Sequence, residues 1–128
     1  NRTPDRAAEL ARTFGCEHAA WDARHKLVAN LIVNCTSVGL APKHGESPLP
    51  AEILHSNQIV FDTIYRPVET RLLHAARAAG CRVVDGMTMF LRQAREQFTL
   101  WTGREVQPDV LFDAAKEALS VNPEQDSR

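Results

Sequence analysis

The sequence has few cysteines, no block of charge of one sign and no long apolar run. Its three cysteines, Cys16, Cys35 and Cys81, stand far apart and lack the CxxC spacing that marks zinc and redox sites. The odd count also argues against a disulfide framework. We therefore expect no metal site and a reducing, cytoplasmic setting.

The charge balance gives no sign of a strongly charged partner. Fifteen Lys and Arg residues stand against sixteen Asp and Glu, and no basic tract is present, so we predict no binding to nucleic acid. The longest apolar run, Leu27–Val33, is interrupted by Asn30 and is too short to cross a bilayer, and no signal peptide precedes it. We predict no membrane partner.

With 44% hydrophobic and 24% charged residues, the composition is typical of a globular protein. We expect one domain over residues 1–120 and a polar tail over 121–128. The first residue is Asn, not Met, which indicates a processed chain or a piece of a longer polypeptide.

The pattern of apolar residues and of helix signals predicts alternating helices and strands. A helix is predicted from Pro4 to Phe14, just before Gly15. Its start is indicated by Thr3, whose side chain can cap the helix, and by Pro4 and Asp5 in the first turn. Further helices are expected over 51–55, 70–79, 87–102 and 108–119, strands over 16–21, 29–36, 58–64 and 81–84, and a long loop over 39–50. This order predicts an α/β fold of the Rossmann-like, three-layer type with a mainly parallel sheet.

The most distinctive polar residues fall at four predicted strand ends. They are the segments 1–3, 34–37, 62–65 and 85–86. Ligands of open α/β sheets bind beyond the carboxyl ends of the strands, so these segments are expected to share one crevice.

Arg2 carries the clearest cofactor hypothesis. At the end of a second Rossmann strand, a carboxylate binds the ribose of NAD, whereas an arginine binds the 2′-phosphate of NADP. Arg2 can hold phosphate through two hydrogen bonds, and Arg6 follows in the first turn of the next helix. The pair favours NADP, although two solvated arginines at a helix start are the plain alternative.

The segment Gly86–Gly103 predicts a helix with a buried seam and one polar side chain beside it. The seam residues recur at steps of four and three: Met87, Leu91, Ala94, Phe98 and Trp101. Gln93 lies at the margin, where its amide can donate to and accept from a ligand, and Gly86 allows close backbone approach. A solvated glutamine is the alternative.

Other polar residues have simpler interpretations. Tyr65 could cap the sheet edge, Asn34 could lock the turn after its strand, and Asp62 is expected to be structural rather than catalytic. The five histidines have no ligand spacing and are expected at the surface.

Four segments together resemble the carboxyl-terminal, NADP-binding half of shikimate dehydrogenase. They are NRTPDRAAEL from Asn1, NCTSVGLAP from Asn34, DTIYRPVETRLLHAARAAG from Asp62 and GMTMFLRQAREQFTLWTG from Gly86. The resemblance covers residues 1 to about 119. The last segment is more similar to the form fused to 3-dehydroquinate dehydratase than to the short bacterial enzyme. It implies a chorismate-pathway enzyme of aromatic amino acid biosynthesis that interconverts shikimate and 3-dehydroshikimate with NADP.

The resemblance also implies roles for single residues. Asn1, Arg2, Thr3 and Arg6 would hold the 2′-phosphate, and Thr36, Ser37 and Val38 would line the cofactor crevice. Thr63 and the backbone of Gly86 would lie beside the nicotinamide, and Tyr65 and Gln93 would bind the substrate.

The chain departs from the family pattern in two ways. It has no glycine-rich phosphate loop, and the family's catalytic lysine and aspartate belong to an amino-terminal substrate domain that is not in this sequence. We therefore assign no catalytic residue here and expect the chain alone to be inactive. In the strand order 3-2-1-4-5-6 the missing first strand is central, so its loss leaves unpaired strand edges. We expect that residues outside this numbering or another chain supply the missing strands. Otherwise the remaining strands should close up, or the chain should form oligomers through an exposed edge.

Two rival functions remain open from the sequence. One is a quinate or quinate/shikimate dehydrogenase that uses NAD, and the other is a non-catalytic regulatory module that kept the Rossmann-like fold.

Overall fold

The computed structural model describes residues 1, 3–26 and 28–120. Arg2 and the predicted polar tail lie outside the described residues. The elements, with η for a 3-10 helix, are α1 (Pro4–Phe14), η1 (Trp21–Lys26), β1 (Leu31–Asn34), η2 (Ala51–Ile53), β2 (Ile59–Asp62), α2 (Arg71–Ala78), β3 (Arg82–Val84), α3 (Gly86–Thr102) and α4 (Pro108–Ser120).

Helix α1 has the predicted bounds but not the predicted cap. Gly15 ends it in the left-handed conformation, with φ of 64°, and its N–H donates to the carbonyl of Ala11. Thr3 precedes the helix with an extended backbone, and its side chain makes no capping hydrogen bond. The expected hydroxyl cap is therefore wrong, and Pro4 lessens the need for it because proline has no amide donor.

Three parallel strands form the sheet, in the order β1-β2-β3. The register pairs Leu31 with Ile59 and Val33 with Phe61, and Ile59 with Arg82. The predicted α/β fold with a parallel sheet is confirmed.

The strand predicted over residues 16–21 is wrong. Residues 16–20 form no regular element, and Trp21 already belongs to η1. The segment CEHAAW holds no β-branched residue, which weakens the case for a strand. Among the described residues, β1 is consequently an edge strand of the sheet.

Helix α2 covers one face of the sheet and makes the core with it. The buried cluster is Leu54, Val60, Leu72, Leu73, Ala76 and Cys81, with Ile32 and Val83 packed against it. Thr70 begins the helix with a side-chain cap, because its hydroxyl accepts from the N–H of Leu73.

The opposite face of the sheet is much less covered. Successive side chains of a strand point to opposite faces of the sheet. Val60 and Ile32 point toward α2, so the residues that point to the opposite face are Leu31, Val33, Ile59, Phe61 and Val84. Leu31, Val33 and Val84 are 56%, 45% and 37% exposed. We call these five residues the open face.

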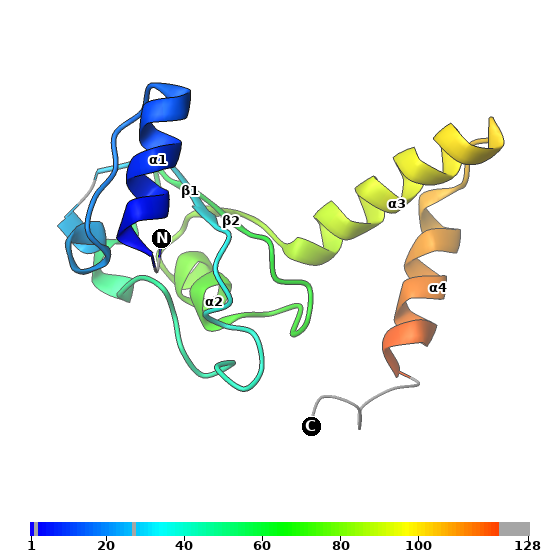
Figure 1. The fold of residues 1–128 in the computed structure, drawn as a ribbon. Helices are drawn as coiled ribbons and strands as arrows, with labels where there is room; N and C mark the ends of the chain where they lie inside the picture. Colours follow the sequence, from blue (N-terminus) through cyan, green and yellow to red (C-terminus); the bar gives the residue numbers. More distant parts are fainter. Residues whose placement is uncertain (2, 27, 121–128) are drawn as a thin grey trace.

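Helix α3 runs away from the sheet, and α4 packs against it after a turn (Figure 1). Met87 is buried, but Phe98 is 37% and Trp101 77% exposed. The predicted seam is therefore buried only at the start of α3. The second half of α3 packs against α4 alone, which does not cover both of its sides. Ala118 of α4 is exposed as well. No helix within the described residues is long and apolar enough for a membrane span.

Candidate functional site

The turn that follows β1 is fixed by the side chain of Asn34, which is 3% exposed. Its Oδ1 accepts from the N–H and the hydroxyl of Thr36, at 3.0 and 2.8 Å. The hydroxyl of Thr36 accepts from the N–H of Val38 at 3.1 Å, and Nδ2 of Asn34 donates to the carbonyl of Val38 at 3.2 Å. The turn-locking role considered for Asn34 is confirmed, and it orders the segment that holds Thr36, Ser37 and Val38.

The end of β2 is organised by Asp62, which is completely buried. Its Oδ1 accepts from Nδ2 of Asn34 and from the N–H of Ile64, both at 3.1 Å. Its Oδ2 accepts from the hydroxyl of Thr70 at 2.7 Å. These three bonds confirm the structural role expected of Asp62.

Thr63 ties the end of β2 to the end of β1. Its N–H and its hydroxyl both donate to the carbonyl of Asn34, at 3.1 and 2.9 Å. The side chain of Thr63 is therefore directed toward β1, at the carboxyl edge of the sheet where the cofactor crevice is predicted.

Gly86 meets the same strand end from the start of α3. A Cβ atom on Gly86 would lie 2.3 Å from the carbonyl oxygen of Ile64 and 2.7 Å from that of Thr63. Asp85 caps the helix, since its Oδ1 accepts from the N–H of Thr88 at 2.7 Å. The glycine therefore has a packing reason within the chain, and this packing holds the start of α3 against the end of β2.

Tyr65 packs against Phe90, a residue of α3 that lies close in sequence to Gln93. The rings of Tyr65 and Phe90 stack, and Tyr65 is 42% exposed. Gln93, which is exposed, lies three residues after Phe90 on α3, and residues at this spacing are neighbours on a helix. Tyr65 therefore packs against α3 about one turn before Gln93. Sequence reasoning missed Phe90, although its spacing from Gln93 was a usable signal.

The residues predicted to hold the 2′-phosphate lie around the start of α1. Asn1, Thr3 and Arg6 are exposed, and Oδ1 of Asn1 accepts from the N–H of Thr3 at 2.9 Å. Arg2 lies outside the described residues, so its pairing with Arg6 stays a prediction.

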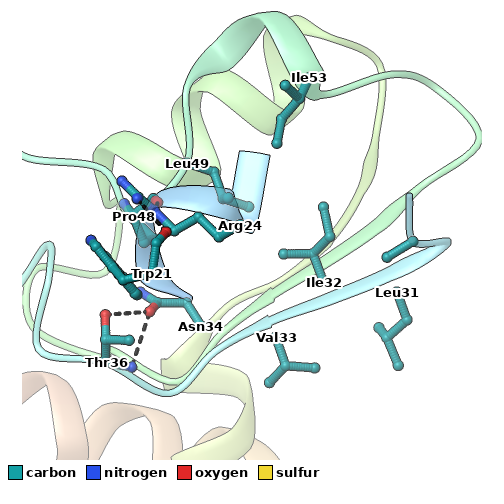
Figure 2. A pocket seen from close by; sticks show the side chains of 11 residues that line it. Trp21, Arg24, Leu31, Ile32, Val33, Asn34, Thr36, Pro48, Leu49 and Ile53 are labelled. Carbon is teal, nitrogen blue, oxygen red and sulfur yellow. Dashed lines mark hydrogen bonds between the residues drawn. The ribbon is translucent and has the colours of Figure 1, made fainter. Parts of the chain in front are cut away.

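An open pocket of about 290 Å³ runs along β1 (Figure 2). Arg24 forms part of its wall, stacked 4.1 Å from the ring centroid of Trp21, and donates to the carbonyls of Pro48 and Trp21 at 2.6 and 2.7 Å. The lining residues are Trp21, Arg24, Ala29, Leu31, Ile32, Val33, Asn34, Thr36, Pro48, Leu49 and Ile53. Thr36 is the residue predicted to bind ligand that also lines this pocket, and the contribution of Trp21 and Arg24 was not foreseen.

Comparison with known proteins identifies the relatives of this chain. Residues 86–116 match the family described as Shikimate 5'-dehydrogenase C-terminal domain. A shikimate dehydrogenase (NADP(+)) from Moorella thermoacetica is 38% identical over 95% of this chain. Residues 86–116 belong to this family, and the chain as a whole is similar to shikimate dehydrogenases.

Solved structures of shikimate and quinate dehydrogenases share the fold. The shikimate 5-dehydrogenase of Thermus thermophilus, in complex with NADP(H) and shikimate, is 40% identical, with a TM-score of 0.77 over 92% of this chain and 44% of its own. The quinate dehydrogenase of Corynebacterium glutamicum, in complex with NAD, is 30% identical, with a TM-score of 0.73 over 91% of this chain and 43% of its own. The chain spans less than half the length of the relatives it matches, with 45% of the Moorella shikimate dehydrogenase covered.

Proposed function

We propose that this chain is the cofactor-binding part of an NADP-dependent shikimate dehydrogenase, which interconverts shikimate and 3-dehydroshikimate. The observation that carries the proposal is the similarity over 95% of the chain to a relative of that name. Residues 1–120 form the cofactor-binding domain in this proposal, and the substrate domain belongs to the rest of the polypeptide. The scattered, free cysteines fit a cytoplasmic enzyme.

The ends of β1, β2 and β3 fit a dinucleotide. Asn34 and Asp62 join the first two strand ends, and Gly86 packs the third against Thr63 and Ile64. Dinucleotides bind at such carboxyl edges of Rossmann-like sheets. The segment 36–38 and Thr63 would contact the cofactor there, with the backbone of Gly86 beside them.

When NADP is bound, its nicotinamide supplies hydride transfer to and from the substrate carbon. The task of this chain is to place the two reactants. Tyr65 and Gln93 would hold the hydroxyl groups of shikimate from the side of α3, while the segment 36–38 would hold the cofactor. Asn1, Arg2, Thr3 and Arg6 would bind the 2′-phosphate and so select NADP.

Proton transfer is assigned to the part of the enzyme outside this chain. Lys26 and Lys43 lie outside the strand ends, and Lys116 lies near the ring of Phe112 on α4. We therefore propose that the chain by itself binds but does not turn over its substrates.

The test uses the complete enzyme that contains this chain. Formation of NADPH is followed spectroscopically with shikimate or quinate, and with NADP+ or NAD+, which gives four values of kcat/KM. The proposal predicts the highest value for shikimate with NADP+. Absence of turnover in all four, together with no cofactor binding by calorimetry, contradicts it and favours a regulatory module.

A quinate or quinate/shikimate dehydrogenase that uses NAD is the second candidate. The similarity to the Corynebacterium enzyme, a quinate dehydrogenase in complex with NAD, favours it. A higher kcat/KM for quinate with NAD+ in the same four measurements would select this candidate instead.

A further inference from the structure

One chain of hydrogen bonds crosses the carboxyl edge of the sheet. It runs from the hydroxyl of Thr70 to Asp62, then to the amide of Asn34, and from there to Thr36 and Val38. Thr70, Asp62 and Asn34 are each at most 3% exposed, so water does not compete for these bonds.

The bond between Asn34 and Asp62 joins two segments that the proposed function uses differently. Asn34 orders the segment 36–38, assigned to the cofactor. Asp62 accepts from the N–H of Ile64, which lies between Thr63 and Tyr65, and so orders the segment that faces the nicotinamide and the substrate.

We propose that Asp62 is a positioning residue of the reaction. Through Asn34 it fixes the cofactor segment 36–38 relative to segment 63–65, and hence the alignment of the nicotinamide with the substrate carbon. This inference rests on the proposed function and extends it, because it names a residue that acts on the reaction without touching either reactant.

The chemistry of the network explains why a carboxylate stands at this position. Three donors converge on Asp62, from Asn34, Ile64 and Thr70, and an ionised carboxylate is an acceptor at both oxygens. Hydrogen bonds to a charged acceptor are stronger than neutral ones. A side chain that only fills the space would remove the acceptor of the Ile64 N–H, of the Thr70 hydroxyl and of one amide hydrogen of Asn34.

Gln58 offers a matched control at the other end of the same strand. It is 4% exposed, accepts from the N–H of His55 at 2.9 Å and donates to the carbonyl of Ala29 at 3.0 Å. It therefore bridges the segments at the amino ends of β1 and β2, as Asp62 does at the carboxyl ends, but away from the proposed site.

The test compares Asn34→Ser, Asp62→Ala, Asp62→Asn and Gln58→Leu in the complete enzyme. Serine at position 34 still accepts from the N–H of Thr36 but is too short to reach Asp62. Asparagine at position 62 keeps an acceptor for Asn34 and Ile64, and its amide can donate to Thr70. Melting temperature, kcat and both KM values are measured for each variant.

We expect Asn34→Ser and Gln58→Leu both to lower the melting temperature. Only Asn34→Ser and Asp62→Ala should lower kcat, by about tenfold to a hundredfold, which is the scale of a reactant displaced by about 1 Å. Asp62→Asn should recover most of the kcat that Asp62→Ala loses, and Gln58→Leu should keep the kcat and KM values of the unsubstituted enzyme.

Two results overturn the inference alone: an unchanged kcat in Asn34→Ser, or an equal loss of kcat in Gln58→Leu. If Asp62→Ala does not fold, Asn34→Ser against Gln58→Leu still decides. If the unsubstituted enzyme does not act on shikimate or quinate, the proposed function fails and this inference fails with it, so the two failures are distinguishable.

Discussion

The ring of Tyr65 stacks on the ring of Phe90, with centroids 5.1 Å apart and planes 18° from parallel. The contact joins the loop after β2 to helix α3 and so fixes where the phenol points. Aromatic pairs contribute about 0.5–1.5 kcal/mol beyond their buried area.

Loss of this contact should weaken substrate binding. We expect Phe90→Ala to raise the KM for shikimate about three- to tenfold, with little change in the KM for NADP+. Phe98→Ala is the control, because Phe98 also lies on α3 and is similarly exposed, at 37% against 40%. Equal KM changes in the two variants would show that the stack does not position Tyr65.

A side chain at position 86 should be poorly tolerated. Gly86→Ala puts a Cβ atom against the carbonyl oxygen of Ile64, a backbone atom that cannot rotate away. We expect a loss of about 2–3 kcal/mol in the free energy of unfolding, as for overpacked sites, measured by urea denaturation.

Gly103→Ala is the control for that experiment. Gly103 has φ of 69° but no atom within 4 Å of its ideal Cβ, so only backbone strain of about 1–2 kcal/mol is added. A smaller loss at position 86 than at position 103 would contradict the close approach between α3 and β2.

Thr3 and Thr70, which precede α1 and α2, should differ in their contribution to stability. Thr70→Val removes a cap worth about 1 kcal/mol and leaves an oxygen of buried Asp62 without its donor, at about 1–3 kcal/mol more. Thr3→Val should change little, because the hydroxyl of Thr3 makes no capping bond. Calorimetric melting of both variants measures the difference, and similar losses would contradict the assigned roles.

Arg2 is expected to select the cofactor. Arg2→Ala should raise the KM for NADP+ about tenfold to a hundredfold and leave the KM for NAD+ unchanged, since a charged hydrogen-bonded contact contributes about 1.5–3 kcal/mol. Arg12→Ala, in the last turn of α1, is the control. An equal change for both cofactors would remove the basis for NADP selectivity.

The chain on its own should associate through the open face and the free edge of β1. We expect Val33→Lys to shift sedimentation of the isolated chain toward the monomer, because a lysine on an edge strand opposes pairing. Val68→Lys is the control, at 47% exposure against 45% for Val33. Unaltered association in Val33→Lys would place the contact elsewhere.

Local signals predicted most elements well. Pro4 and Gly15 fix φ at the two ends of α1, so its bounds could be read directly from the sequence. The strands predicted over 29–36 and 58–64 are present, but they end two residues earlier than predicted, at Asn34 and Asp62. The hydrogen bond between these two side chains was not foreseen, since it joins residues 28 apart in sequence.

Predictions that needed a partner were less successful. The spacing of Phe98 and Trp101 predicts that both side chains are buried, but it does not show which element covers them. In the structure α4 covers this side of α3 only in part. The strand expected over residues 16–21 failed for a related reason, because a weak strand former depends on neighbouring strands. The cation–π pair of Arg24 and Trp21 likewise arises from a turn that periodicity cannot describe.

The open face of the sheet is much less covered than the face under α2, so the stability of the fold depends on what covers it. The buried cluster of six residues lies entirely between the sheet and the segments around α2, so whatever covers Leu31, Val33 and Val84 adds the second layer. Anything that binds the folded form and not the unfolded chain raises the unfolding free energy with its concentration. A partner that covers the open face of the folded chain should therefore raise the apparent melting temperature as its concentration increases.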